Sequence, residues 1–262
     1  MTKVIDILNV LSEKAPVHLA EGYDNVGFIV GRGKKEVTKV IVALDITEKV
    51  VREAAEKGAE LIVSHHPVIF GERKRITDCD VTGEIVLTLA ENGIAAICMH
   101  TNLDSAESGV NSVLAECLGI KVEGVVEPKE DGNVGGGRYG SLEKETSLSD
   151  FLPKVCRALG TGGVKYHDAK IPVKKVAVGG GSCGEYIVKA KALGCDTVVT
   201  ADIKHNQFLD ADHIGINVID AGHFATENVI SPKLVDIIEK AFPDVSVEIA
   251  AANVDCTEFF TV

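Results

Sequence analysis

Short apolar runs alternate along the chain with longer amphipathic segments, which is the pattern of α/β proteins. The pattern is clearest in residues 39–64 and 175–200, where an apolar strand, a turn, an amphipathic helix and a second apolar strand follow one another. The helical part of each segment ends at a glycine, Gly58 or Gly194, a residue common at helix C-termini. Each segment therefore predicts a right-handed βαβ unit in a sheet that helices cover.

The two segments align with each other without a gap, which indicates an internal repeat. The matched pairs are Lys39 with Lys175, Val40 with Val176, Val42 with Val178, Ala54 with Ala190, Gly58 with Gly194 and Ser64 with Thr200. Residues 93–100 and 215–222 continue the similarity as strands that precede helix starts. After the first of these strands, Asp104 or Ser105 can cap a helix that runs to about Leu118.

We therefore expect an α/β protein made of two similar halves with helix-covered sheets. The polar, Gly-rich stretch 128–137 is the expected boundary, so residues 1–127 form the first half and residues 128–262 the second. Residues 245–251 alternate like a strand, and this strand can pair with the first half or with the second.

Composition places the chain among globular proteins, since 45% of its 262 residues are apolar and 25% are charged. The longest apolar run, Ile94 to Met99, is far shorter than the roughly 20 residues of a membrane helix. The first 16 residues carry charges within their apolar pattern and lack the features of a secretory signal. We expect a cytoplasmic protein without a membrane span.

Cysteine usage and net charge argue against several classes of fold and of binding partner. The 7 cysteines are scattered and contain no CxxC pair, so the sequence suggests neither a disulfide framework nor a zinc ribbon. A formal charge of −12 makes nonspecific binding to nucleic acid or to an anionic membrane unlikely. A small anionic substrate would need a locally positive site, such as a bound metal ion.

Residue types that bind metals follow three of the predicted strands, at the ends where α/β sheets form their binding sites. His65 and His66 precede Pro67, which ends regular pairing and allows a turn to bring both imidazoles to one cavity. Asp104 follows the second strand. If Gly222 opens a helix after the third, His223 and Glu227 stand at i and i+4 on one face.

Three imidazoles and two carboxylates suit one or two borderline divalent ions. Zinc, manganese, iron, cobalt and nickel fit this mixed set, whereas magnesium prefers oxygen ligands. A two-metal site has a chemical use, because it lowers the pKa of water and supplies a nucleophile near neutral pH. Each residue also has a plainer interpretation: histidines of the core or surface, a helix N-cap at Asp104, and an exposed helical pair at His223 and Glu227. Their joint placement at strand ends favours the metal site.

A glycine motif competes with the metal site. Gly179–Gly184 (GGGSCG) follows a predicted strand and matches GxGxxG, with Asp202 about 20 residues further on. It is compatible with a nicotinamide or flavin site, with a simpler cradle for phosphate or carboxylate, or with a tight turn alone. Three successive glycines satisfy such a pattern easily, and the first copy of the repeat lacks them.

Other polar residues are candidates for acid/base work or anion binding. His100 and His205 are the predicted catalytic residues, and Asp202 is a further candidate to orient or exchange a proton. Arg73, Lys74, Arg75 and Arg138 can bind substrate anions, although a solvated loop and a hairpin edge explain them equally well.

Five motifs together resemble one known family, the Ngg-one-interacting-factor-three-like proteins, often labelled type 2 homologues of GTP cyclohydrolase I. The motifs are LAEGYDNVGFIVG (19–31), LIVSHHPVIF (61–70), HTNLDSAESGVN (100–111), TADIKHNQFLDA (200–211) and INVIDAGHFATE (216–227). The resemblance implies a two-domain α/β protein, a toroidal homohexamer, and a dinuclear metal site in the cleft between the halves, facing an interior cavity. It assigns the ligands to the residues reached above: His65, His66, Asp104, His223 and Glu227.

The chain departs from the family pattern at Tyr23, Ala201 and Cys183, where tryptophan, glycine and glycine are usual, and at 262 residues it lacks the inserted domain of longer members. We carry forward a metal-dependent hydrolase that acts on a nucleotide such as GTP or on a phosphorylated small molecule. The alternative is a non-enzymatic metal-binding, regulatory or scaffold protein. A dinucleotide-dependent redox enzyme, based on Gly179–Gly184, is a third hypothesis.

Overall fold

A computed structural model describes residues 1–129 and 132–260 of the chain. Its helices are α1 (Val4–Lys14), α2 (Glu48–Glu56), α3 (Val81–Glu91), α4 (Thr101–Ser105), α5 (Val110–Cys117), α6 (Leu148–Leu159), α7 (Tyr186–Ala192), α8 (His205–Ile214), α9 (His223–Glu227) and α10 (Ser231–Ala241), with the 3₁₀ helices η1 (Val17–Leu19) and η2 (Asn228–Ile230). Its strands are β1 (Gly27–Val30), β2 (Lys39–Ala43), β3 (Leu61–Ser64), β4 (Ala95–Cys98), β5 (Ile120–Gly124), β6 (Glu127–Lys129), β7 (Val134–Gly136), β8 (Arg138–Thr146), β9 (Lys165–His167), β10 (Val173–Ser182), β11 (Thr197–Ala201), β12 (Asn217–Asp220) and β13 (Ser246–Ile249).

These elements form two compact units. The first unit contains Met1–Leu103 and Ser231–Val254, and the second contains Asp104–Ile230 and the residues from Asp255 onward. The first unit is built on a five-stranded sheet in the order β1-β4-β3-β2-β13. Strands β13, β2, β3 and β4 run parallel, and β1 is antiparallel to β4 at one edge.

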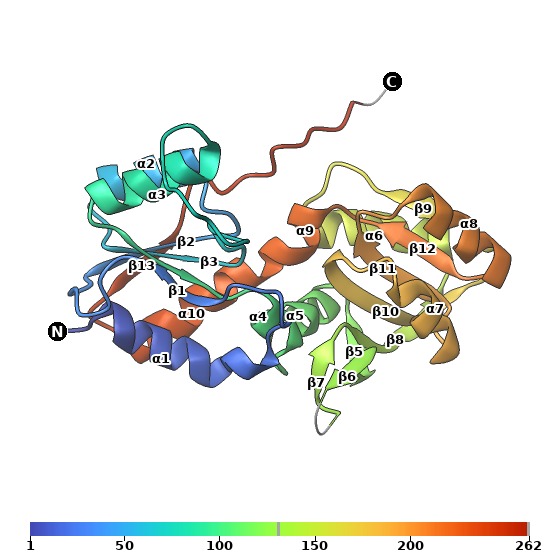
Figure 1. The fold of residues 1–262 in the computed structure, drawn as a ribbon. Coiled ribbons are helices and arrows are strands. Elements are labelled where there is room, and N and C mark those ends of the chain that lie inside the picture. The colour runs from blue at the N-terminus through green and yellow to red at the C-terminus, as the bar shows by residue number, and fades with distance from the viewer. Residues whose placement is uncertain (130–131, 261–262) are drawn as a thin grey trace. The chain divides into compact units, whose positions relative to one another are not determined.

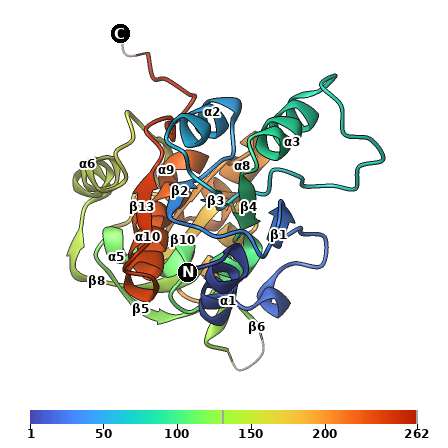
Figure 2. The ribbon, with the colours of Figure 1, turned by 90° about the vertical axis from the view of Figure 1, so that its left-hand side faces the viewer.

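Helices cover both faces of this first sheet. Helices α2 and α3 pack side by side on one face, and α1 and α10 pack side by side on the other (Figure 1 and Figure 2). All four residues from Val40 to Ala43 in β2 are buried, as expected for a strand covered on both faces. Ile41 and Ala43 join the core with Val51 of α2, so by strand alternation the other two face α1 and α10.

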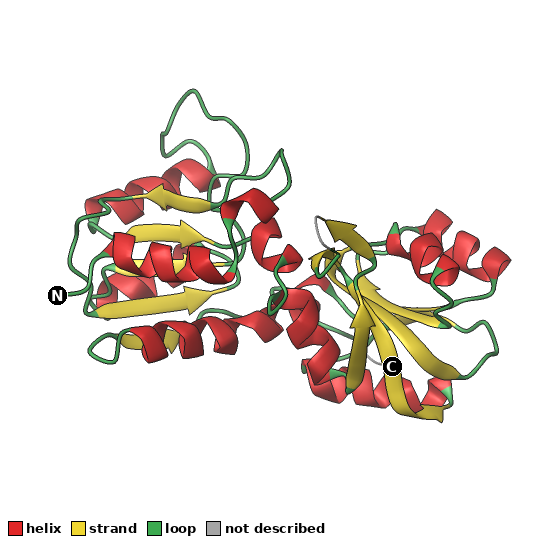
Figure 3. Ribbon diagram, turned by 90° about the horizontal axis from the view of Figure 1, so that it is seen from below, coloured by secondary structure: helices red, strands yellow, loops and turns green. Residues whose placement is uncertain are grey.

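The second unit is built on a six-stranded sheet in the order β5-β8-β10-β11-β12-β9. Its centre, β10-β11-β12, is parallel, and the flanking strands are antiparallel. Val176 and Val178 of β10 pack into a core with α5 and α6, whereas the intervening Ala177 packs into another core with α7 and α8. Figure 3 shows helices on both faces of the sheet in each unit.

Four strands follow the same order in the two sheets, whereas the next neighbour differs, since β13 is parallel to β2 and β8 is antiparallel to β10. In the first, β2-β3-β4 run parallel and antiparallel β1 closes the edge; in the second, β10-β11-β12 run parallel and antiparallel β9 closes the edge. Both predicted βαβ units, β2-α2-β3 and β10-α7-β11, are present. The predicted α/β fold with two similar halves is therefore confirmed, and the shared strand order agrees with a duplication.

The predicted single helix from Asp104 or Ser105 to Leu118 was wrong. Asp104 lies inside α4, and the next helix, α5, begins after its N-cap residue Gly109. A side chain stabilises this break, because Asn111 Nδ2 donates to the Asp104 carbonyl at 3.0 Å. Asp104 is therefore not the N-cap of a long helix.

Two further segments bear on the domain organisation. The Gly-rich stretch contributes β6 and β7, which pair within the second unit, and its residues 130–131 lie outside the described residues. The C-terminal strand β13 pairs with β2, so it joins the first unit. The units divide at residues 103/104, 230/231 and 254/255; a domain boundary at residues 127/128 stays a prediction.

Candidate metal centre

Three histidines gather at the carboxyl ends of β3 and β4 in the first unit. The ring centroids are 5.0 Å apart for His65 and His66, 5.1 Å for His65 and His100, and 5.4 Å for His66 and His100. One ring nitrogen from each lies within 4.8 Å of the others. The strands place them there, because β3 and β4 are parallel neighbours with Ser64 opposite Cys98.

The turn after β3 holds the two adjacent histidines. The backbone N–H groups of His65 and His66 still donate to the carbonyls of Ala43 and Leu44, at 3.3 and 2.9 Å. The Ser64 hydroxyl donates to the His66 carbonyl at 2.7 Å, which closes a tight turn before Pro67. His65 is fully buried and His66 is partly exposed. Their neighbouring rings show that both imidazoles lie at one strand end, as the sequence predicts.

Each of the three imidazoles pairs its Nδ1 with a fixed oxygen. His65 Nδ1 lies 2.8 Å from the Met99 carbonyl, His66 Nδ1 lies 2.8 Å from Asp45 Oδ1, and His100 Nδ1 lies 2.9 Å from Asp24 Oδ1. These oxygens accept hydrogen bonds, so Nδ1 is the donor and Nε2 of the neutral ring carries the lone pair. This arrangement orients metal-binding histidines in proteins.

Asp24 is held as a carboxylate. Besides His100, it accepts hydrogen bonds from the backbone N–H of Thr101 at 3.0 Å and from the Thr101 hydroxyl. Burial by itself raises the pKa of Asp24, but the hydrogen bonds from His100 and Thr101 outweigh this effect and hold the pKa well below its usual range. Asp24 is therefore ionised at neutral pH and fixes the orientation of the His100 ring.

A second group of candidate ligands lies in the second unit. His223 and Glu227 are the first and last residues of α9, which begins after Gly222, so they stand at i and i+4 as the sequence predicts. His223 Nε2 is 3.0 Å from Glu227 Oε2, and His223 Nδ1 is 2.6 Å from Asp202 Oδ2. Carboxylate oxygens of Asp104 and Glu227 lie within 4.8 Å of each other.

This second group has the donor chemistry of a cation site. Asp104 and the buried Glu227 bring negative charges close together, and like charges at this separation repel strongly away from water. Once Nδ1 of His223 donates to Asp202, its Nε2 needs a proton or a cation between it and Glu227. Carboxylates together with an imidazole fit borderline divalent ions, as do the three oriented imidazoles of the first unit.

The glycine motif does not have the geometry of an anion cradle. Strand β10 runs through Ser182, so Gly179, Gly180 and Gly181 lie in a strand rather than in a tight turn before a helix, and Gly184 follows the strand. The Gly180 N–H donates to Asn111 Oδ1 at 2.9 Å, and the Gly181 N–H donates to the Thr226 hydroxyl at 3.0 Å. Side chains thus occupy the amides that a phosphate or dinucleotide would need.

The glycines instead make room for the candidate ligands. A Cβ atom on Gly181 would lie 2.2 Å from Glu227 Oε1 and 3.1 Å from His223 Nε2. Gly181 also has φ of +66°, a conformation that suits glycine. The GGG sequence therefore lets β10 pack closely against α9.

The remaining candidates are distributed elsewhere. Arg73 pairs with Asp80 at 2.9 Å, and Lys74 and Arg75 are exposed. Arg138 is buried and donates to the carbonyls of Ala106, Gly135 and Gly137, so its role is structural. Burial lowers the pKa of this guanidinium. His205 is exposed at the first residue of α8.

Sequence reasoning missed the carboxylates that orient the histidines of the first unit. Asp24 is 76 residues from His100, and Asp45 is 21 residues from His66. No local spacing links such pairs, because strand pairing brings them together. Asp202, which the sequence marked as a candidate to orient a proton, does contact His223.

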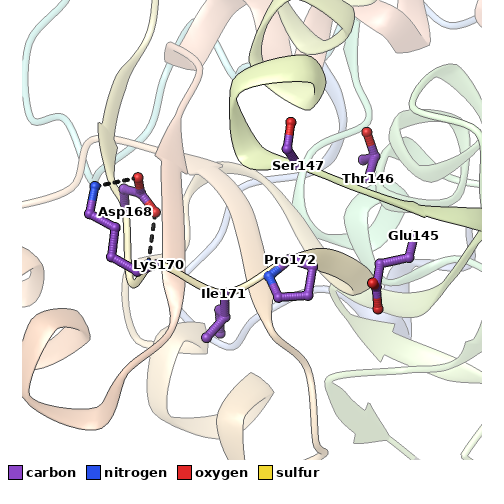
Figure 4. A pocket seen from close by; sticks show the side chains of 7 residues that line it. All are labelled: Glu145, Thr146, Ser147, Asp168, Lys170, Ile171 and Pro172. Carbon is purple, nitrogen blue, oxygen red and sulfur yellow. Dashed lines mark hydrogen bonds and ion pairs between the residues drawn. The ribbon is translucent and has the colours of Figure 1, made fainter.

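A separate cavity of about 440 Å³ lies in the second unit, between the end of β8 and the loop before β10 (Figure 4). Its lining residues are Glu145, Thr146, Ser147, Asp168, Lys170, Ile171 and Pro172. Lys170 pairs with Asp168, two residues away in the same loop, at 2.7 Å. The predicted ligands lie outside this lining.

Comparison with known proteins identifies the family. A family model described as Duf34/NIF3 (NGG1p interacting factor 3) matches residues 2–257. The chain belongs to the DUF34/NIF3 family. This confirms the resemblance seen in the five sequence motifs.

Relatives within the DUF34/NIF3 family match over most of their length. A Clostridium perfringens protein named GTP cyclohydrolase 1 type 2 homolog is 38% identical, over 91% of this chain and 90% of its own. A Clostridium acetobutylicum protein of the same name is 31% identical over 98% of both chains. The crystal structure of Staphylococcus aureus hypothetical protein SA1388 has a TM-score of 0.91 at 29% identity, covering 98% of this chain and 99% of that one.

Among the helices in residues 1–129 and 132–260, none has the length and apolar composition needed to cross a bilayer.

Proposed function

We propose that this member of the DUF34/NIF3 family is a metal-dependent hydrolase with a dinuclear centre. Its metal ligands are His65 and His66 from the first unit and Asp104, His223 and Glu227 from the second. The single observation that carries the proposal is that His65, His66 and His223 each pair Nδ1 with an oxygen acceptor. Nδ1 pairing of this kind orients Nε2 for metal binding.

The two groups complement each other in charge. The first unit contributes imidazoles, which are neutral ligands, and the second contributes two carboxylates with one imidazole. Two divalent cations need both kinds of donor to complete their coordination and to balance part of their charge. The two groups of ligands are also linked along the chain. Asp104 of the second group lies in α4, four residues after His100 of the first group, which supports their use in one metal centre.

Metal ions bound by these residues supply Lewis acidity and lower the pKa of water, as hydrolysis requires. The protein supplies orientation and a proton carrier. With Nδ1 of His100 held by Asp24, the ring accepts or releases a proton at Nε2, which is the task of a general acid or base. His205, on the exposed start of α8, is a second candidate for proton transfer.

We infer that the substrate is a small anionic molecule, a nucleotide such as GTP or a phosphorylated metabolite. The relatives carry the name GTP cyclohydrolase 1 type 2 homolog, which makes GTP the first compound to test. Bound cations attract a phosphate despite the chain's net charge of −12. We also propose a homohexameric assembly, which the family resemblance implies, and the cytoplasmic location that the sequence pattern predicts.

The proposal is tested by a substrate screen on protein loaded with zinc, manganese, iron, cobalt or nickel. Asp104→Ala and Glu227→Ala should each lose more activity than the roughly 10- to 100-fold typical of a residue that only orients a ligand. Glu239→Ala, at an exposed position of α10, is the matched control and should keep full activity. Equal traces of activity in all four proteins, with metal bound normally by the wild type, would favour the metal-binding or regulatory alternative.

A further inference from the structure

Two exposed aromatic side chains lie beside the histidine cluster of the first unit. Tyr23 is 69% exposed and Phe70 is 55% exposed, and their ring centroids are 6.4 Å apart. The Phe70 ring meets the His100 ring edge to face, with centroids 6.1 Å apart and planes at 77°. The two rings, whose planes are tilted by 55°, therefore form an exposed aromatic pair next to the imidazoles.

Hydrogen bonds fix the loops that carry these rings. Asn25 Nδ2 donates to the Ile69 carbonyl at 2.6 Å, which joins the Tyr23 loop to the Phe70 loop. The Glu21 N–H donates to the Thr101 hydroxyl at 2.9 Å, and Asp24 accepts from Thr101 and His100. Tyr23 lies between these anchored residues, so its backbone is held while its side chain stays exposed.

A structural role in the core does not account for this exposure. Phe151, a core aromatic residue of the second unit, is 1% exposed, as a ring that stabilises the fold should be. Both large rings are exposed on anchored loops, so the fold lacks the stabilising free energy that their burial would supply. Paired exposed rings beside polar groups are typical of sites that bind a ligand.

We propose that Tyr23 and Phe70 bind a planar heteroaromatic ring of the substrate by stacking, such as the base of a nucleoside or nucleotide. The proposal rests on the proposed function in one respect, since it takes the histidine cluster as the place where the bound molecule reacts. Stacking suits a chain with a charge of −12, because every base has a polarisable face and the contact needs no positive side chain.

The test is calorimetric titration of metal-loaded protein with guanosine, which has a base and no phosphate, and with ribose 5-phosphate, which has a phosphate and no base. Tyr23→Ala and Phe70→Ala should each weaken guanosine binding by roughly 5- to 150-fold, the range for one base on one aromatic ring. Tyr23→Phe keeps the ring and should bind like the wild type. Tyr166→Ala removes a comparably exposed ring, at 52%, from β9 and is the matched control.

Wild-type affinity for guanosine in both alanine variants, or no binding of guanosine by the wild type, would overturn the proposal. Equal losses for guanosine and ribose 5-phosphate in a folded variant would overturn it too. A change in oligomeric state with unchanged guanosine affinity would assign the rings to contacts between copies of the chain. The titration measures binding and not turnover. Glu227→Ala can therefore be inactive as a hydrolase and still bind guanosine. The failure of this proposal and the failure of the proposed function are thus distinguishable.

Discussion

At the residue scale, Gly181 brings the backbone of β10 close to the candidate metal ligand Glu227. A Cβ atom there would overlap Glu227 Oε1 at 2.2 Å, and φ is +66°. Gly181→Ala should therefore displace the Glu227 carboxylate and lower the metal content of the purified protein. It should also reduce the free energy of unfolding by more than the ~1–2 kcal/mol that a left-handed alanine costs.

Gly215 provides the matched control, since it has φ of +67° and nothing within 4 Å of an added Cβ atom. Gly215→Ala should show the conformational cost alone, with unchanged metal content. Urea unfolding and elemental mass spectrometry measure both quantities. Equal stability losses and equal metal contents in the two variants would show that Gly181 does not make room for Glu227.

At the residue scale, local signals in the sequence located part of the candidate site. The pair His65 and His66 before Pro67 and the i, i+4 spacing of His223 and Glu227 are such signals, and the structure places each pair together. Asp24 and Asp45 carry no such signal, because their partners are distant in sequence. The glycine motif left several interpretations open, because glycines that admit a phosphate and glycines that admit a neighbouring side chain look alike in a sequence.

At the scale of elements, helix α2 contacts the C-terminal segment of the first unit, which contains β13 and the residues after it. Glu53 accepts hydrogen bonds from the N–H groups of Ala251 and Ala252, each at 2.8 Å, and from Lys57 at 2.7 Å. Lys57 also pairs with Glu248 of β13 at 3.1 Å. These contacts fix β13 and the residues after it against α2.

Glu53→Ala should lower the free energy of unfolding by about 1.5–3 kcal/mol at neutral pH, the range for hydrogen bonds to a charged group. Burial alone raises the pKa of Glu53, but the hydrogen bonds from Lys57, Ala251 and Ala252 outweigh it, so the pKa in the folded state is lowered. A lowered pKa stabilises the fold above the unfolded-state value of about 4.3. The difference from wild type should therefore shrink as the pH falls below that value.

Glu48→Ala is the control for this prediction. Glu48 lies on the same helix and pairs with Arg52 at i, i+4, but both side chains are exposed, so its removal should cost less than about 0.5 kcal/mol. Chemical unfolding across the pH range measures both variants. A loss in Glu53→Ala that is no larger than in Glu48→Ala, or that grows toward acid pH, would contradict the account.

The sequence predicted these elements well where the signal is local. The two βαβ units were found from apolar runs, amphipathic spacing and a terminal glycine, all within 26 residues of chain. The strand that pairs with β13 was not predictable. An alternating pattern indicates that one face of a strand is buried, but it does not indicate which sheet the strand joins. The break between α4 and α5 was missed because Gly109 and the bond from Asn111 to Asp104 interrupt a continuous helical pattern.

At the scale of the whole molecule, each unit carries one group of candidate ligands at the carboxyl ends of its parallel strands. His65 and His66 follow β3 in the first unit, and His223 follows β12 in the second. The two similar α/β halves thus place their candidate ligands at the same end of their sheets. The central claim is that both groups are needed to hold the metal ions.

Metal content per chain tests this claim most directly. Protein purified after loading with each candidate metal is analysed by elemental mass spectrometry for the wild type, His66→Ala, Glu227→Ala and the exposed control His213→Ala. Thermal unfolding confirms that each variant is folded. We predict two ions per chain in the wild type and in His213→Ala, and loss of at least one tightly bound ion in both His66→Ala and Glu227→Ala. Wild-type metal content in either ligand variant would contradict the account.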